Sequence, residues 1–341
     1  MSILKGGLIG CGYFARNHLN AWKEVQGAQI VAVCDLDGNR ATAYAHEFGI
    51  KSRYTDVEAM FHAEPLDFVD IVTQHTTHRH LVEASAVHNL HVICQKPMAP
   101  TLEDAKAMVN ACESAGVQFM VHENFRWQTP MRALKGAAGN LGELFFGRIS
   151  FRTAFNVYAN QPYLAEEKHL IIADLGVHLL DLARFFMGEV DDLYCQTASV
   201  KPGIKGEDVA TVMLKIANGA TCLVEVSYAS KLEEELCPQT LVHLEGAHGS
   251  ATLGPHYALT VVKDSQVTHQ TATPRSFPWM TSPWEVIQDS VIAIEQHWVD
   301  CLRENRPPET LGRDSLRTLE LVFGAYQSVE TGTIYKVSDR V

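Results

Sequence analysis

With 341 residues, the chain is long enough for two domains of ordinary size, and its 46% hydrophobic residues are typical of globular proteins. Its formal net charge of -12 disfavours nucleic acid and anionic membranes as partners. The N-terminus lacks a cationic, apolar leader, no apolar run is long enough to span a bilayer, and the 8 cysteines show no metal-ligand spacing. We therefore expect a cytoplasmic protein with reduced cysteines.

A glycine-rich turn, Gly-Cys-Gly-Tyr-Phe-Ala, follows the first apolar run at residues 10–15. Where a strand turns into a helix, Gly10 permits a tight turn and Gly12 lets a pyrophosphate approach the bare backbone. The next apolar run, 29–34, leads to Asp35, at the spacing of a carboxylate that binds the adenine ribose. The alternative is a glycine-rich turn followed by a surface aspartate. The predicted dinucleotide contacts are Gly10, Gly12, Tyr13, Phe14 and Asp35.

Short apolar runs alternate with helical patterns in the N-terminal third of the chain, which is typical of a parallel sheet with crossover helices. One helix should begin after Thr101, a capping residue, and stop at Gly116. This rhythm predicts a doubly wound α/β domain, a Rossmann sheet, over residues 1–123. The predicted strands lie near residues 3–9, 29–34, 51–54, 68–73, 91–94 and 117–121.

Two polar segments follow strands of this sheet at the edge where open α/β sheets bind ligands. Residues 73–78 follow the fourth strand and residues 94–97, Cys-Gln-Lys-Pro, follow the fifth. A lysine at that edge can stabilise a developing oxyanion and lower the pKa of a neighbouring base. The alternatives are a polar loop that enters a helix and a solvated loop lysine. The predicted cofactor contacts here are Thr73, Gln74, His75, His78, Gln95 and Lys96.

Residues 122–127 follow the sixth predicted strand, where they either line a substrate pocket or form a salt-bridged hinge. Beyond them the pattern changes to period two, and Asn-Gly at 218–219 predicts a hairpin. Residues 124–341 therefore read as an α+β domain with a large, mainly antiparallel open sheet, whose C-terminal helix can pack back on the first domain. A second hairpin is predicted at 246–249, and helices at 285–304 and 313–330.

One helical segment, residues 171–187, carries an apolar stripe beside a polar one that contains Asp174, His178 and Asp181. Residues four apart on a helix can pair, and a carboxylate that holds an imidazole makes it a better base near neutral pH. The alternative is an N-cap aspartate and a half-buried core histidine. A metal is not predicted, because no third ligand has convincing spacing.

Together these motifs resemble the glucose-fructose oxidoreductase / inositol dehydrogenase family, Gfo/Idh/MocA, over essentially the whole chain. Two positions depart from the family pattern: Gln95 stands where glutamate is usual, and Gln74 where proline is usual. The loss of a charged neighbour can alter the pKa of Lys96. The matching motifs are the turn at Gly10–Ala15, the segment Thr73–His78, Gln95-Lys96-Pro97, and Asp174 with Gly176, His178 and Asp181.

The resemblance implies an NAD-dependent oxidoreductase that acts on a small sugar or polyol. In that family pattern His178 takes the substrate proton, Asp174 orients it and Lys96 binds the reacting oxygen. We expect NAD rather than NADP, because the charge of Asp35 repels a 2′-phosphate. Asn124 is a further predicted cofactor contact. The predicted substrate contacts are Lys96, Glu123, Arg126, Trp127, Arg152, Asn156, Asp174 and His178.

Within the family, the segments 95–100, 121–126 and 152–155 are most similar to members that oxidise D-apiose, a branched aldose, at its anomeric carbon to a lactone. The alternatives are an inositol, polyol or other aldose dehydrogenase, and a non-catalytic NAD-dependent sugar sensor. The resemblance also implies a homodimer or homotetramer that pairs through the uncovered face of the second sheet. The apolar residues expected on that face are Val212, Leu214, Ile216, Leu223 and Val226, unless they face only the core.

Overall fold

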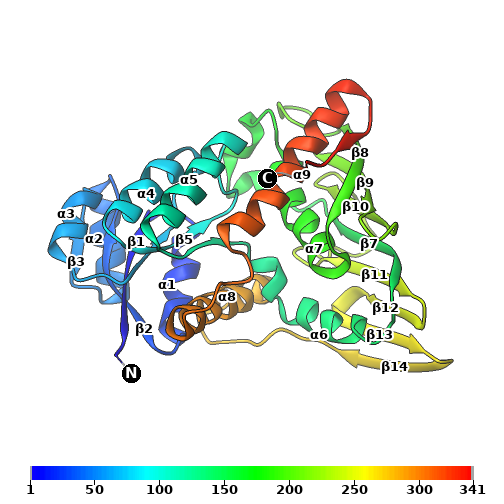
Figure 1. The fold of residues 1–341 in the computed structure, drawn as a ribbon, viewed down its shortest axis with the longest axis horizontal. Helices are drawn as coiled ribbons and strands as arrows, with labels where there is room; N and C mark the ends of the chain where they lie inside the picture. The colour runs from blue at the N-terminus through cyan, green and yellow to red at the C-terminus, as the bar shows by residue number, and fades with distance from the viewer. Residues whose placement is uncertain (1, 339–341) are drawn as a thin grey trace. The chain divides into compact units, whose positions relative to one another are not determined.

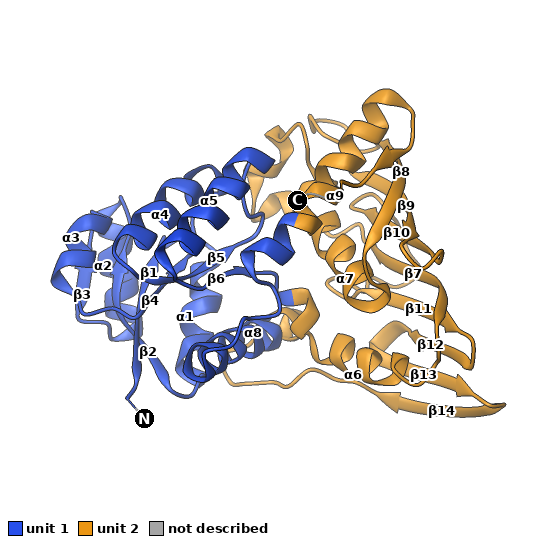
Figure 2. Ribbon diagram, in the orientation of Figure 1, with its two compact units in different colours: residues 1–124, 288–316 blue, residues 125–287, 317–341 orange. Residues whose placement is uncertain are grey.

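The computed structural model describes residues 2–338, which form two compact units (Figure 2). Residues 1–124 with 288–316 make up the first unit, and residues 125–287 with 317–341 the second. Residues 288–316, which the prediction placed in the second domain, pack with the first unit because Trp298 is fully buried and lies 6.5 Å from the ring of Phe68. Residues 1 and 339–341 of the predicted domains lie outside the described residues.

The first unit contains a parallel sheet whose strands lie in the order β3-β2-β1-β4-β5-β6 within residues 2–338. This is the strand order of doubly wound dinucleotide-binding domains, and the predicted Rossmann sheet is confirmed. The order reverses between β1 and β4, so ligands are expected beyond the carboxyl ends of these strands. The strands are β1 (Leu4–Ile9), β2 (Ala28–Cys34), β3 (Ser52–Tyr54), β4 (Phe68–Ile71), β5 (His91–Gln95) and β6 (Phe119–His122).

Helices cover both faces of this sheet, with α4 and α5 on one face and α1 and α8 on the other (Figure 1). The α5 helix begins and ends as its sequence predicts: the Thr101 hydroxyl accepts a bond from the Asp104 amide, and Gly116 closes the last turn. The helices are α1 (Ala15–Glu24), α2 (Gly38–Phe48), α3 (Val57–Ala63), α4 (His75–Val87), α5 (Leu102–Ala115) and α8 (Glu285–Glu304).

The second unit is built on a sheet in the order β14-β13-β12-β11-β7-β10-β9-β8-β15, as described within residues 2–338. All neighbours are antiparallel except β7 and β10, and both predicted hairpins are present. The helices α6 (Thr129–Ala138), α7 (Val177–Met187) and α9 (Gly312–Thr331) lie on one face of this sheet (Figure 1). The strands are β7 (Leu144–Arg152), β8 (Val190–Ala198), β9 (Val209–Ile216), β10 (Thr221–Ser227), β11 (Leu241–Gly246), β12 (Gly249–Leu253), β13 (Ala258–Lys263), β14 (Gln266–Thr271) and β15 (Tyr335–Lys336).

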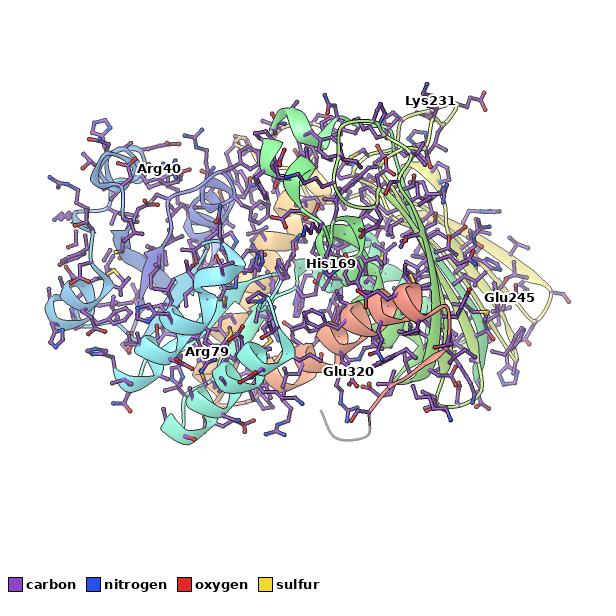
Figure 3. All side chains as sticks on the ribbon, turned by 90° about the horizontal axis from the view of Figure 1, so that it is seen from above. Arg40, Arg79, His169, Lys231, Glu245 and Glu320 are labelled. Carbon is purple, nitrogen blue, oxygen red and sulfur yellow. The ribbon has the colours of Figure 1, made fainter. Side chains whose placement is uncertain are left out.

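The other face of the sheet is less apolar than predicted. Four of the five residues expected there point into the core of the unit and are at most 1% exposed: Val212, Leu214, Ile216 and Val226. That prediction was wrong, because alternation shows which residues share a face but not which face the helices cover. The outer face carries Met213 on β9 and an ion pair between Arg148 and Glu225 at 2.5 Å. It also carries Glu245 of β11, which pairs with His243 (Figure 3).

All eight cysteines lie within the described residues, and each is buried and free of a disulfide. Burial raises the pKa of thiols such as Cys11 and Cys222 to about 12, so these side chains stay neutral and pack as small apolar groups. Among residues 2–338, no helix combines the length and the apolar character that crossing a membrane requires.

Candidate active site

The turn after β1 has the backbone that a bound diphosphate needs. Gly10 adopts φ +98°, and a Cβ there would lie 2.6 Å from the carbonyl oxygen of Val72. A Cβ at Gly12 would meet nothing within 4 Å, so space is open above this backbone. The α1 helix begins at Ala15, which directs its unpaired first-turn N–H groups toward the turn. Tyr13 is 63% exposed beside this opening. These features fit the diphosphate of a dinucleotide.

Asp35 lies directly after β2, where its carboxylate organises the turn from both sides. Its Oδ2 accepts a hydrogen bond from the Cys11 amide at 2.7 Å, and its Oδ1 accepts one from the Asp37 amide at 2.8 Å. A carboxylate has about four acceptor positions, so the ribose hydroxyls can bind as well. Arg40, a cation that could bind a 2′-phosphate, lies on α2 (Figure 3) and pairs with Asp37 at 3.6 Å.

The segment after β4 contains three predicted cofactor contacts in accessible positions: Thr73 and His75 are half-buried and Gln74 is exposed. His78 is different, because it is fully buried on α4. Its two ring nitrogens face the carbonyl oxygens of Met98 and Thr73, each at 3.1 Å. Burial lowers the pKa of His78 to about 4, so the ring is neutral and donates to one carbonyl at a time. His78 therefore joins the segment after β4 to the segment that follows Lys96.

Lys96 comes directly after β5, at the ligand-binding edge of the sheet, and is half-buried. Its backbone amide donates to Oε1 of Gln95 at 2.7 Å. Gln95 is 8% exposed and is directed into the unit. Asn124, at the end of the first unit, is also buried and donates to the hydroxyl of Ser290 at 2.6 Å. Gln95 and Asn124 thus hold the structure around the predicted cofactor site through contacts inside the unit.

In the second unit, the segment that carries Asp174 begins with a π-helical turn, Ile172–Gly176, and continues as α7. Glu207 holds this start, because its Oε1 accepts from the amides of Leu170 and Ile172 at 3.1 and 3.2 Å. The Tyr326 hydroxyl donates to Glu207 at 2.8 Å, and the ring of His169 stacks on Tyr326 at 4.1 Å (Figure 3). Single π turns inside helices are frequent at functional sites.

His178 lies on the first turn of α7 and is 5% exposed. Its imidazole stacks flat on Phe125, with ring centroids 3.8 Å apart and an interplanar angle of 3°. Asp174 accepts a hydrogen bond from the Tyr228 hydroxyl at 2.7 Å. Burial and the charge of Asp174 raise the pKa of Tyr228 well above its ordinary value, so the hydroxyl stays a neutral donor. Phe125 lies inside the segment 122–127 and Tyr228 directly follows β10, but no local pattern predicts a role for either residue.

The predicted substrate residues of the second unit divide into two groups. Arg126 makes two bonds to Asp181, at 2.5 and 2.7 Å, and both side chains are buried, so this guanidinium anchors α7. Trp127 is buried, and the guanidinium of Arg132 lies 4.8 Å from its ring.

The second group is more accessible. Arg152 ends β7 and is half-buried, whereas Asn156 is exposed and lies beyond the strand. The strand β7 ends before Ala154, whose amide donates to Glu235 at 3.0 Å. In the first unit, the predicted substrate residue Glu123 is buried at the end of β6.

Comparison with known proteins agrees with this division into two units. Residues 4–123 match the model of the GFO/IDH/MocA oxidoreductase family, NAD-binding Rossmann fold, and residues 135–252 match the GFO/IDH/MocA C-terminal domain. The D-apiose dehydrogenase of Rhizobium rhizogenes is 50% identical over 334 residues, which cover 97% of each chain. That of Paraburkholderia graminis is 50% identical over 96% of this chain and 88% of its own.

A solved structure matches the whole fold. The crystal structure of an oxidoreductase from Agrobacterium radiobacter, in complex with NAD+, L-tartaric acid and magnesium, superimposes with a TM-score of 0.97. The two sequences are 49% identical, over 98% of this chain and 99% of that one.

Proposed function

Because the chain belongs to the GFO/IDH/MocA family of oxidoreductases, we propose that it oxidises D-apiose at the anomeric carbon to the lactone. It is an NAD-dependent sugar dehydrogenase with an NAD-binding Rossmann domain. The observation that carries the choice of D-apiose is the 50% identity, over nearly the whole chain, to two enzymes that bear this substrate in their names. The position of oxidation, the anomeric carbon, follows the resemblance of segments 95–100, 121–126 and 152–155 to family members that oxidise D-apiose there.

The proposed reaction removes a hydride and a proton from the anomeric carbon and its hydroxyl. NAD, when bound, supplies the hydride acceptor. A ring nitrogen of His178 takes the hydroxyl proton, which leaves the lactone carbonyl. Stacking on Phe125 fixes the plane of this imidazole, and burial shields it from bulk water. Asp174 supports the protonated imidazole, and its carboxylate is oriented by the Tyr228 hydroxyl.

Lys96 supplies the positive charge in this scheme. Its ammonium binds the reacting oxygen and stabilises the negative charge that develops there as the proton leaves. Lys96 and His178 thus have separate proposed tasks, one on the reacting oxygen and the other on its proton. We expect the reaction to be lost when either residue is changed.

An uncharged sugar fits the polar groups proposed for the substrate. The Arg126 guanidinium is already bonded to Asp181, which leaves Arg152 as the accessible cation of the predicted set in the second unit. A sugar phosphate would therefore find no cluster of cations among these residues. Glu123, Arg152 and Asn156 are proposed to exchange hydrogen bonds with the sugar hydroxyls. A site built for hydroxyls rejects analogues that lack them, by up to about 10⁴–10⁵.

Steady-state rates with NAD on a panel of aldoses, polyols and inositols test this proposal, with NADH absorbance as the readout. D-apiose should give the highest kcat/KM, well above D-glucose and myo-inositol. A hexose or an inositol that outperforms D-apiose overturns the choice of substrate but not the family. If a compound of the panel binds but none of them yields NADH, the result would instead favour a sugar sensor.

The uncovered face of the nine-stranded sheet is proposed to pair two copies of the chain. Met213 is 48% exposed on β9, and Leu223 is half-buried on the neighbouring strand. Met213→Glu places a charge on this face and should convert a dimer or tetramer into a smaller species in light scattering. Val87→Glu, which changes an exposed apolar residue of α4 in the first unit, is the control. A wild-type monomer at micromolar concentration excludes the pairing.

A further inference from the structure

A buried polar cluster in the first unit reaches the backbone of Lys96, although the proposed reaction does not use it. Asp70 lies on β4 and is fully buried. Its Oδ2 faces Nδ1 of His18 and accepts from the Trp22 indole, both at 2.8 Å. Nε2 of His18 lies 3.0 Å from Nε2 of Gln95, whose Oε1 accepts from the Lys96 amide at 2.7 Å. The bonds therefore run without a break from a central strand to Lys96.

The direction of every bond in this path follows from one group. A backbone N–H can only donate, so the oxygen of the Gln95 amide must face Lys96 and its NH2 must face His18. Nε2 of His18 then has to accept, which places the ring proton on Nδ1. Nδ1–H donates to Asp70, which also accepts from an indole that can only donate. Asp70 thus accepts both bonds through Oδ2, and His18 carries its ring proton on Nδ1.

A second acid lies beside this path. Glu295 on α8 is fully buried, its Oε1 lies 3.4 Å from Nδ1 of His18, and within the described residues neither carboxyl oxygen has a hydrogen-bond partner. Burial and the charge of Asp70 raise its pKa well above the ordinary value, so Glu295 is neutral. His18, His122 and Glu295 have the composition of a metal site, but a protonated Nδ1 cannot bind a metal.

We propose that Gln95 and His18 are positioning residues for Lys96. The path Asp70–His18–Gln95 fixes the backbone from which the Lys96 side chain extends, and it requires an amide at position 95 and a neutral imidazole at position 18. This inference rests on the proposed role of Lys96 in binding the reacting oxygen. A carboxylate at position 95 would face the lone pair of His18 Nε2, which is unfavourable unless His18 takes a second proton.

The protonation of His18 can be measured without any assay of activity. With ¹⁵N-labelled histidine, long-range ¹H–¹⁵N spectra of the full chain distinguish the two neutral tautomers and the imidazolium, and His18→Asn identifies the signals. We expect the ring proton on Nδ1 and none on Nε2, because Gln95 donates to Nε2. A proton on Nε2, or an imidazolium near neutral pH, overturns the proposed direction of the path.

The variant Gln95→Glu tests the effect on Lys96. The introduced carboxylate and Asp70 then flank His18, which we expect to become an imidazolium. Its other titratable neighbours are Glu295 and His122, whose ring lies 4.2 Å from the ring of His18. Displacing a catalytic group by a fraction of an ångström lowers turnover, and we expect a loss of about 10- to 100-fold in kcat with NAD affinity nearly unchanged. A new fall in kcat toward alkaline pH, as the added proton leaves, is the signature that a purely structural role would not give.

A matched control is Gln239→Glu in the second unit. Gln239 is also buried, donates to the Gly254 carbonyl at 2.6 Å and accepts from the His256 amide at 2.9 Å. It should leave the pH profile unchanged. If Lys96→Met keeps its turnover, the proposed role of Lys96 fails whatever His18 does. If Lys96→Met is inactive while Gln95→Glu has wild-type kcat and pH profile, the positioning role alone is overturned.

Discussion

The two units hold their proposed catalytic side chains by different means. In the first unit, Lys96 is fixed through its backbone, by Gln95 next to it in sequence and by a buried path behind. In the second unit, His178 is fixed through its ring, by Phe125, which lies far away in sequence, on a helix whose start depends on Glu207 and Tyr326. The bonds of the first unit thus act on the backbone of Lys96, from which its side chain extends. A residue held by its ring keeps one orientation, as suits a base.

The largest effects are expected from removing either side chain. Lys96→Met and His178→Ala should each lose about 10²–10⁴ in kcat, since this is what a positioned acid, base or charge contributes. NAD binding, followed by fluorescence titration, should persist in both. Lys106→Met and His62→Ala change exposed residues of α5 and α3 and serve as controls. Near-normal turnover in one variant would remove that unit's residue from the mechanism.

The strand ends of the first unit could be predicted because the residues that mark them are contiguous in the sequence. The turn at Gly10, the acid at Asp35 and the lysine after β5 each follow a short apolar run, and parallel strands place their carboxyl ends at one edge. The cap at Thr101 and the Asn218-Gly219 hairpin are equally local. Such features need no knowledge of distant contacts.

The second unit was less predictable, because its site depends on contacts between distant residues. No local pattern predicts that the Tyr228 hydroxyl reaches Asp174, or that Phe125 covers His178. The π turn at Ile172–Gly176 breaks the regular period on which the predicted polar stripe relied. Period-two alternation likewise gave the correct strands but placed Val212 on the wrong face. The alternation that predicts a strand is local in the sequence. Which face of the sheet is buried depends on helices elsewhere in the chain.

Cofactor selectivity should depend on the first unit alone. Asp35→Ser removes the charge that repels a 2′-phosphate, and the ratio of kcat/KM for NAD over NADP should fall by about 10- to 100-fold. Asp56→Ser is the control, because serine preserves the N-cap of α3 while an exposed carboxylate is removed elsewhere in the unit. Steady-state kinetics with both cofactors give the ratios. Equal efficiency of the wild-type enzyme with NAD and NADP would contradict the assignment of Asp35.

Removing the hydrogen bond between Tyr228 and Asp174 should lower kcat less than removing His178 itself. In Tyr228→Phe, Asp174 loses a donor inside the unit, and we expect kcat to fall by about tenfold. A hydrogen bond to a charged group contributes about 1.5–3 kcal/mol, so the free energy of unfolding should decrease by a similar amount. Kinetics and urea denaturation measure the two effects. Tyr194→Phe, on the outer face of β8, should change neither. A stability loss with unchanged kcat would show that Tyr228 acts on the fold only.

The smallest effect on activity is expected at His78, which supports the first unit without reaching the substrate. Its folded-state pKa of about 4 lies below the ordinary value of 6.5, so between these pH values the unfolded chain binds a proton that the folded chain does not. Stability is therefore present above about pH 6.5 and is lost as the pH falls toward about 4, by at most about 3 kcal/mol. In His78→Gln this acid-dependent loss should disappear, whereas His62→Gln, an exposed histidine, should retain it. Urea denaturation at a series of pH values compares the slopes, so any constant cost of the substitution cancels. If the wild-type and His78→Gln proteins lose stability in parallel over this range, His78 is protonated in the folded chain and does not join the two segments as a neutral donor.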